Sequence, residues 1–184
     1  MHVKNTTIQN RSKQGRLTSE HKIPSQNVSD SETIRFIQDL QNLQESKEAI
    51  LFAIGKQLLG KNNNPAISKF LSEYKYKDLK INNIPKSQFD LLGSVYQFLN
   101  SKLENLEKGS FYTGTQIALD IVGDLDFNNS QTIFDPACGS GAFLFNSDAG
   151  PKQIYGVDFD PIAVMIAKFN YFIKFINHKL FFVT

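Results

Sequence analysis

The sequence is short of several residue types, and each shortage excludes a class of protein. It has no tryptophan and a single cysteine, Cys138, so an intramolecular disulfide framework and a multi-cysteine zinc site are both excluded. No apolar run approaches the roughly 20 residues of a membrane helix, and the polar N-terminus lacks the apolar centre of a signal peptide. The three histidines share no metal-ligand spacing, so no metal site is predicted. We therefore expect a cytoplasmic protein without a membrane partner.

The sequence also lacks a strong excess of either charge, because the 184-residue chain has 20 basic and 18 acidic residues. The balance is uneven along the chain: residues 1–28 carry five basic residues and one acidic residue. This segment is polar without an apolar period, which predicts a disordered basic arm. Such an arm is either a phosphate-seeking tail or a solvated terminus without a role. The rest of the chain has apolar residues enough for a core.

Apolar residues at helical spacing predict a helical region over residues 29–107. Its first helix is expected to begin at Ser29 or Ser31 and to end at Gly60, with a polar step at Lys47. A second, short helix is expected to carry Ile67 and its neighbours. The clearest helix has a single apolar stripe, made of Phe89, Leu92, Tyr96, Leu99, Leu103 and Leu106.

Residues 108–184 have the pattern of an α/β domain. A loop runs into a helix whose expected buried face is Ile117, Ala118, Ile121, Val122 and Leu125. Two short apolar strands, at 132–134 and 153–157, follow on either side of a glycine-rich loop. A last helix is expected to start at Asp160 as N-cap, with Pro161 at its first position. Strand, loop, strand and helix in this order predict the opening of a parallel sheet.

The end of the chain predicts loose packing. Only two or three strands are expected after residue 131, so the sheet has a bare edge and uncovered faces. Five phenylalanines crowd this part, where a complete domain would cover them: Phe169, Phe172, Phe175, Phe181 and Phe182.

The stretch at residues 134–143, Phe-Asp-Pro-Ala-Cys-Gly-Ser-Gly-Ala-Phe, carries the chemistry. Asp135 ends the first strand, and Gly139 and Gly141 follow at a sharp turn, where they present bare backbone to a ligand. Asp158 ends the second strand, 19 residues after Gly139. An acid at about that distance can accept both hydroxyls of a ribose. The alternative is a structural turn with incidental acids.

The residues favour one nucleoside cofactor over another. NAD binding requires a third glycine to open a helix beneath the pyrophosphate, whereas Leu144 stands three positions after Gly141. A carboxylate just before the glycines repels phosphates and suits a cation, such as the α-amino group or the sulfonium region of S-adenosylmethionine. Phe159, next to Asp158, is placed to lie against a purine ring. We therefore predict S-adenosylmethionine as the cofactor.

These motifs resemble those of a known family. Asp-Pro-Ala-Cys-Gly-Ser-Gly-Ala-Phe-Leu at 135–144 and Gly-Val-Asp-Phe-Asp-Pro at 156–161 resemble the first two cofactor motifs of adenine-N6 DNA methyltransferases of restriction–modification systems. Lys-Gly-Ser-Phe-Tyr-Thr at 108–113 resembles the segment that covers the methionine end of the methyl donor. The resemblance spans about residues 89–175 and is to type I modification subunits and fused type II restriction–modification enzymes.

The resemblance implies a partial Rossmann-like sheet, preceded by the helical region, with S-adenosylmethionine as methyl donor and DNA as substrate. Asp158 would hold the ribose, with Phe159 beside it. The residues implied to line the methionine end and to hold the amino acid part are Tyr112, Thr113, Asp135, Pro136, Ala137, Cys138, Gly139 and Gly141. Gly114 stands where the family usually has proline, which loosens the start of the following helix.

One family motif is absent from this sequence. The family transfers the methyl group with Asn/Asp-Pro-Pro-Tyr/Phe, whereas the single Asn-Pro here, Asn64-Pro65, is followed by Ala66. We therefore assign no catalytic residue and expect the front part of a methyltransferase, truncated or split. A second chain or a C-terminal part would supply catalysis and target recognition. Two alternatives stay open: a non-catalytic cofactor-binding subunit, and a methyltransferase of another substrate such as RNA or protein.

Overall fold

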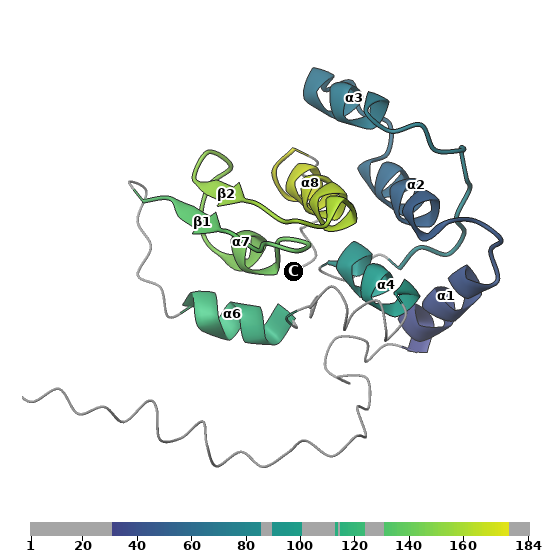
Figure 1. Cartoon of the computed structure of the whole chain (residues 1–184), viewed down its shortest axis with the longest axis horizontal. Coiled ribbons are helices and arrows are strands. Elements are labelled where there is room, and N and C mark those ends of the chain that lie inside the picture. The colour runs from purple at the N-terminus through teal and green to yellow at the C-terminus, as the bar shows by residue number, and fades with distance from the viewer. Residues whose placement is uncertain (1–30, 86–89, 101–112, 114, 124–130, 177–184) are drawn as a thin grey trace, which may run out of the picture.

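A computed structural model describes residues 31–85, 90–100, 113, 115–123 and 131–176. In chain order, its elements are α1 (Ser31–Gln41), α2 (Lys47–Leu59), α3 (Pro65–Ser72), α4 (Leu91–Leu99), α6 (Thr115–Gly123), β1 (Ile133–Asp135), α7 (Ala142–Asn146), β2 (Ile154–Gly156) and α8 (Pro161–Phe175) (Figure 1). Within these ranges, no helix combines the length and the apolar character that a membrane span needs.

The first predicted helix is two helices. Ser46 has extended backbone, and its side chain accepts a hydrogen bond from the Ala49 N–H at 3.2 Å, so a new helix starts at Lys47. The polar step is therefore an N-cap rather than an interruption within one helix. The predicted end at Gly60 is confirmed, because Gly60 caps α2 with a positive φ of 63°. Asn64 caps α3 in the same way as Ser46 caps α2.

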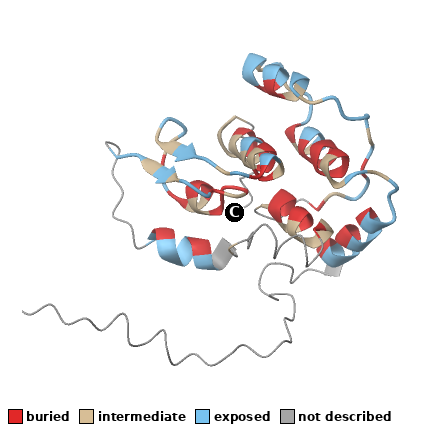
Figure 2. Cartoon of the chain, viewed as in Figure 1, coloured by how far each residue is buried: buried red, intermediate tan, exposed pale blue. Residues whose placement is uncertain are grey.

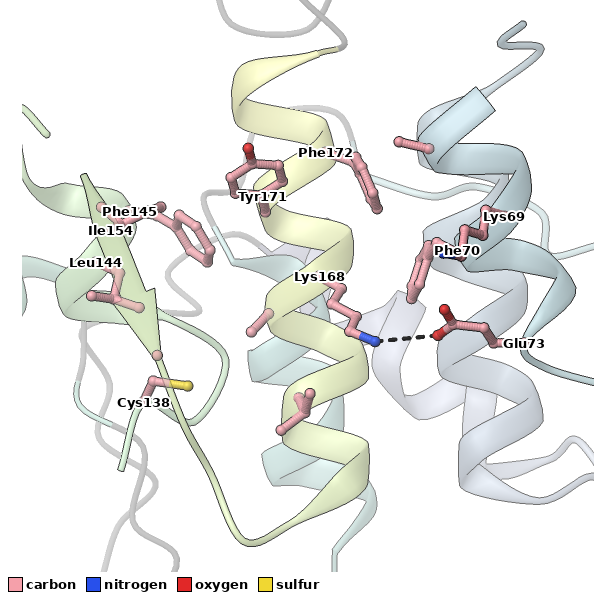
Figure 3. Close-up of a pocket in the computed structure, with 14 residues that line it drawn as sticks. Lys69, Phe70, Glu73, Cys138, Leu144, Phe145, Ile154, Lys168, Tyr171 and Phe172 are labelled. Carbon is pink, nitrogen blue, oxygen red and sulfur yellow. Dashed lines mark hydrogen bonds and ion pairs between the residues drawn. The ribbon is translucent and has the colours of Figure 1, made fainter. Parts of the chain in front are cut away.

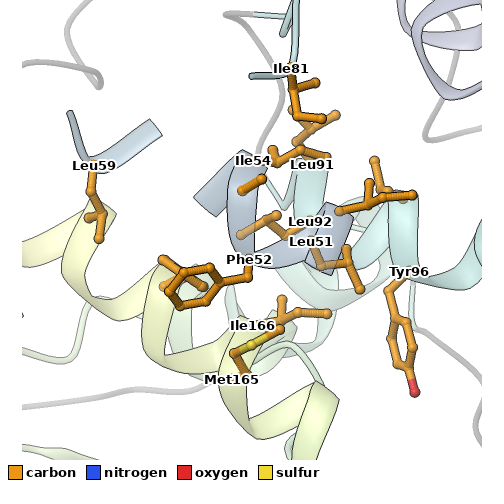
Figure 4. Close-up of a cluster of buried hydrophobic side chains, with 14 of the residues drawn as sticks. Leu51, Phe52, Ile54, Leu59, Ile81, Leu91, Leu92, Tyr96, Met165 and Ile166 are labelled. Carbon is orange, nitrogen blue, oxygen red and sulfur yellow. The ribbon is translucent and has the colours of Figure 1, made fainter. Parts of the chain in front are cut away.

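Helix α8 completes the core of the N-terminal helices. It packs against α2 and α4, and the shared cluster includes Leu51, Leu92 and Ile166 (Figure 4). Phe169 is fully buried, and the centroid of its ring lies 5.7 Å from that of Phe52. The N-terminal helices thus cover Phe169 and Phe172 of α8.

The expectation of uncovered phenylalanines is therefore wrong for two of the five. Phe169 and Phe172 are buried because α2 and α3 supply apolar partners, Phe70 among them, whose ring centroid lies 4.9 Å from that of Phe169. Phe175 is half-buried. Phe181 and Phe182 lie outside the described residues.

The predicted parallel sheet is confirmed as a pair of strands. β1 and β2 pair in parallel, with Ile133 opposite Ile154 and Asp135 opposite Gly156. The two isoleucines face a second, smaller cluster around Leu144 of α7. Helix α8 is tied to the end of α7, because Lys174 Nζ donates to the carbonyl oxygen of Phe145 at 2.6 Å.

The other face of the sheet is open. Phe134 and Tyr155 are opposite one another in the register and are 61% and 56% exposed (Figure 2). Helix α6 packs against α7 through two residues of its predicted apolar face: Ala118 and Val122 are buried, whereas Ile117 and Ile121 are exposed. Leu125, the fifth residue of that face, lies outside the described residues. The predicted burial of those two isoleucines is wrong, because the side of α6 that meets α7 carries Ala118 and Val122 instead.

Candidate functional site

Asp135 and Asp158 lie at the same edge of the sheet. Asp135 is the last residue of β1, and Asp158 follows β2 by two residues. The pairing continues beyond the strands, because the Val157 N–H donates to the Asp135 carbonyl at 3.0 Å and the Cys138 N–H donates to the Val157 carbonyl at 2.9 Å. Both acids thus follow the carboxyl ends of adjacent parallel strands, where open α/β sheets bind ligands.

The loop between β1 and α7 depends on two glycines. Gly139 and Gly141 have positive φ angles of 56° and 92°, a conformation that other residues rarely adopt. The Gly141 N–H donates to the carbonyl of Cys138 at 2.8 Å, which closes the turn. A side chain on Gly141 would also clash with the ring of Phe145. The predicted sharp turn is therefore present, but Gly141 is buried and only Gly139 of the two glycines is half-buried, so the turn presents less backbone than the sequence predicts.

Hydrogen bonds join the glycine loop to the second acid. The Gly139 N–H donates to Asp158 Oδ2 at 2.8 Å, and the Asp160 N–H donates to Asp158 Oδ1 at 2.8 Å. Each oxygen of Asp158 accepts one bond and retains capacity for a second. The Asp158 carboxylate is thus held in a fixed orientation, with both oxygens able to accept from a ligand.

Asp135 has more acceptor capacity than Asp158. Its Oδ1 accepts the Ala137 N–H at 3.0 Å, and its Oδ2 has no hydrogen-bond partner in the part of the chain that the structure describes. Pro136 and Ala137 are exposed at the same loop. Phe159 is 88% exposed beside Asp158. The edge therefore presents two carboxylates and one uncovered aromatic ring.

Cys138 contributes its backbone to the loop but its side chain to the core. The side chain is buried in the cluster with Leu144 and Phe145. Burial, together with the charges of Asp158 and Asp135, raises the pKa of the Cys138 thiol to about 11. The thiol is therefore protonated at neutral pH and is a poor nucleophile.

The predicted front loop is described at one position only. Thr113 is half-buried, while Tyr112 and Gly114 lie outside the described residues. The contact of Tyr112 and Thr113 with a cofactor stays a prediction.

Five residues around the site were not predicted to act there. They form hydrogen bonds with one another around the candidate site. They are Asp90 and Tyr96 of the α4 segment, Ser140 of the glycine loop, Asp160 at the N-cap of α8, and Asn170 of α8. One signal was available in the sequence: Asp90-Leu-Leu-Gly93 has an acid three residues before a glycine at the start of an apolar helix, which is typical of an N-cap. Nothing in the sequence indicated its partner, 50 residues later.

A cavity of about 450 Å³ lies apart from the two acids. It is lined by apolar residues of α3, α7, α8 and β2, and the Lys168–Glu73 ion pair, at 3.2 Å, spans it from α8 to α3 (Figure 3). The loop reaches it only through Cys138, and neither Asp135 nor Asp158 lines it. The candidate site is therefore the two-acid edge rather than this cavity.

Comparison with known proteins decides the family. The N-6 DNA methylase family model matches residues 87–184, more than half of the chain. The chain belongs to the N-6 DNA methylase family. This result confirms the resemblance drawn from the motifs, and the match includes β1, β2, their acids and α4, while α1–α3 lie before it.

Two relatives of this N-6 DNA methylase family member are methylase subunits of type I restriction enzymes. The type I restriction enzyme MjaIX methylase subunit of Methanocaldococcus jannaschii is 35% identical over 97 residues, or 46% of this chain and 17% of that protein. The MjaVII methylase subunit of the same organism is 31% identical over 91 residues, or 45% of this chain and 16% of that protein. No solved structure is significantly similar to the chain.

Proposed function

We propose that this N-6 DNA methylase family member binds S-adenosylmethionine at the two-acid edge, as the donor-binding part of an adenine-N6 DNA methyltransferase. The observation that carries the proposal is the pair of carboxylates at the ends of two adjacent parallel strands, Asp135 and Asp158, of which Asp158 accepts the Gly139 N–H of the glycine loop. An edge with two acids and no phosphate-binding third glycine favours a cationic nucleoside over a dinucleotide.

The residues present fit the parts of this donor. The two oxygens of Asp158 retain the acceptor capacity that two ribose hydroxyls require. Asp135 Oδ2, which no donor among the described residues contacts, suits the α-amino group. The exposed ring of Phe159 supplies a surface for the adenine, and Tyr112 and Thr113 would cover the methionine end. When bound, the donor supplies a methyl group activated by its sulfonium.

The same proposal extends to the fold and its division. We place β1 and β2 as the first two strands of a Rossmann-like sheet, in residues 108–184, preceded by a helical region at 29–107 and a basic arm at 1–28. The parallel pairing and the position of α7 between the strands support this assignment.

DNA is the proposed substrate and an adenine amino group the proposed methyl acceptor, which would place the reaction in the cytoplasm. The sequence lacks Asn/Asp-Pro-Pro-Tyr/Phe, and the matched part spans 17% and 16% of the two relatives. We therefore propose that a further polypeptide segment or a second chain supplies catalysis and target recognition. The same absence favours a second candidate function, a cofactor-binding subunit that is not catalytic by itself.

Titration calorimetry with S-adenosylmethionine tests the binding site. Asp158→Ala removes two charge-assisted hydrogen bonds to the ribose and should weaken binding by about 1–3 kcal/mol. Asp148→Ala is the matched control, because Asp148 is an exposed acid of the same part of the chain that does not lie at the two-acid edge. Equal affinities for the two variants, or an affinity for NAD above that for S-adenosylmethionine, would refute the site.

Transfer of labelled methyl groups tests the reaction. We expect no transfer to DNA from the 184-residue chain alone, because its sequence lacks the Asn/Asp-Pro-Pro-Tyr/Phe motif that would hold the adenine amine. Transfer to DNA is expected when a segment that carries the missing tetrapeptide is added. Transfer by the chain alone would contradict the assignment of catalysis to a second segment, and transfer to RNA or protein but not DNA would change the substrate class.

A further inference from the structure

Two polar side chains of the α4 segment reach the loops that carry the candidate site. Asp90 is the N-cap of α4, and Tyr96 lies in the middle of the helix. Both precede the sheet in the sequence by more than 30 residues. Neither is part of the two-acid edge, but Asp90 is hydrogen-bonded to Ser140 of the glycine loop and Tyr96 to Asp160, two residues after Asp158.

Asp90 holds the glycine loop at Ser140. The Ser140 hydroxyl donates to Asp90 Oδ2. The amide of Asn170 donates to Asp90 Oδ1 at 2.8 Å and to the Ser140 carbonyl at 3.0 Å. Ser140, between the two glycines of the loop, is 1% exposed and is thus fixed at both its hydroxyl and its carbonyl.

The start of α4 is built around the Asp90 carboxylate. Its Oδ1 also accepts the Gly93 N–H at 2.9 Å, and any side chain at Gly93 would clash with the carboxylate. Asp90 itself has a left-handed backbone, with φ 54°, which costs energy in a residue other than glycine. The backbone is thus strained at Asp90, the residue whose carboxylate contacts the glycine loop.

Asp90 is a poor choice for stability alone. No cationic group among the described residues pairs with it, so its carboxylate is held by neutral donors, and burial raises its pKa. A buried acid without a cation is costly, and apolar residues of similar size often stabilise such a position better. A role in placing the loop explains the acid better than a contribution to the core.

Tyr96 holds the second loop. It is fully buried, and its hydroxyl donates to Asp160 Oδ2. Figure 4 shows the hydroxyl pointing away from the apolar side chains of the core. Asp160 in turn caps α8 through the Ile162 N–H at 2.9 Å, and its own N–H donates to Asp158. Tyr96 is therefore one residue removed from the proposed ribose ligand.

The contacts close into a ring. Asp90 of α4 accepts the Ser140 hydroxyl, and the N–H of Gly139, which precedes Ser140, donates to Asp158. The Asp160 N–H also donates to Asp158, and the Asp160 carboxylate accepts the hydroxyl of Tyr96, which returns to α4. We propose that Asp90 and Tyr96 are positioning residues, through which α4 fixes both halves of the donor site relative to one another. The inference rests on the proposed function. It means that α4, a helix outside the sheet, determines the geometry of the donor site.

Variants of the two residues test this role by titration calorimetry with S-adenosylmethionine. Asp90→Ala removes the hold on Ser140 and should weaken binding about tenfold or more, since bonds to a charged group are lost. Tyr96→Phe keeps the ring in the core and removes only the hydroxyl; we expect about a threefold to tenfold loss. Asp90→Asn keeps the acceptor for Gly93 and Asn170 and offers Ser140 a donor, so it should restore most of the affinity.

A control separates positioning from general loss of stability. Ser46→Ala removes the N-cap of α2, a cap that is bonded to neither loop, so it should lower the melting temperature but change the affinity by less than about twofold. Equal losses of affinity in Ser46→Ala and Tyr96→Phe would overturn the proposal, as would full affinity in a folded Asp90→Ala protein.

Hydrogen–deuterium exchange keeps the inference testable without ligand. In the free chain, Asp90→Ala and Tyr96→Phe should speed exchange of the amides at 138–141 by about tenfold relative to wild type, while Ser46→Ala should not. Faster loop exchange without binding of S-adenosylmethionine would support the role of α4 and refute the proposed cofactor. Unchanged loop exchange in both variants would refute the role of α4, whatever the cofactor.

Discussion

The molecule has two regions that differ in how completely they cover their apolar surfaces. In the helical body, formed by α1–α4 with α8, the described helices bury one continuous cluster. In the sheet region, formed by β1, β2 and α7, the described residues form a cluster on one face only, around Leu144 and Phe145. The opposite face exposes Phe134 and Tyr155 (Figure 2).

The residues that stabilise the fold and the residues of the candidate site therefore lie in different regions. The candidate ligand residues lie in the region with the smaller cluster, while the residues that fix them, Asp90 and Tyr96, belong to the helical body. The exposed edge is thus free to accept a ligand without depending on its own core for its geometry. The body should therefore respond strongly to core substitutions, and the open sheet face weakly.

The largest effect is expected at the centre of the helical body. Phe169→Ala removes a fully buried ring that contacts the rings of Phe52 and Phe70, so the free energy of unfolding should fall by about 3–5 kcal/mol. Urea denaturation followed by circular dichroism measures it. A loss below about 1 kcal/mol would show that α8 is not an essential part of this core.

A smaller effect is expected between the sheet and α7. A Cβ on Gly156 would lie 2.8 Å from Leu144 Cδ1 and 2.9 Å from Cys138 Sγ, so Gly156→Ala should cost about 1–3 kcal/mol of unfolding free energy through overpacking. Gly123→Ala is the matched control, because its Cβ would meet nothing within 4 Å. Equal stabilities of the two variants in thermal unfolding would indicate that this cluster is loosely packed.

A pH-dependent effect is expected at the contact between the regions. Burial raises the pKa of Asp90, so the folded chain binds this proton more tightly than the unfolded chain. The unfolding free energy contributed by Asp90 therefore falls as pH rises above the ordinary aspartate value of about 4 and through the raised pKa. Asp90→Asn removes this loss, so its stability relative to wild type should increase from pH 4 to pH 8. Urea denaturation of both proteins across that pH range measures the effect. If Asp90 were solvated, the difference in unfolding free energy between Asp90→Asn and wild type would not change with pH.

The smallest effect on stability is expected on the open face. Phe134→Ala makes the same change as Phe169→Ala at a side chain that is 61% exposed, and the free energy of unfolding should change by no more than about 0.5 kcal/mol. Because the apolar face shrinks, the binding of a hydrophobic dye should decrease. A loss as large as that of Phe169→Ala would mean that this face is covered in solution.

The sequence predicted the elements that have strong local signals. Asp160 with Pro161 marked the start of α8, the apolar runs before Asp135 and Asp158 marked the strands, and the glycines marked the turn. Each of these signals lies within a few neighbouring residues. The pairing of the two acids at one edge followed from the parallel order alone.

What the sequence did not predict depends on contacts between distant segments. The sequence predicts only a polar step at Lys47 where the structure separates α1 from α2, because a serine such as Ser46 next to an apolar period is ambiguous until its cap bond is seen. The burial of Phe169 required knowing that α8 returns to α2 and α3. The bonds of Asp90 and Tyr96 join residues 50 and 64 positions apart, which no local period encodes.

The position of α8 also constrains the order in which the chain can fold during synthesis. About 60 residues separate the end of α4, at Leu99, from Pro161, and domains tend to fold as units while the chain emerges N-terminus first. Helices α1–α4 leave the ribosome without the helix that fills their core, and β1, α7 and β2 follow before it arrives. The core of the helical body, and the hydrogen bond between Tyr96 and Asp160, can therefore be completed only after α8 has been synthesised.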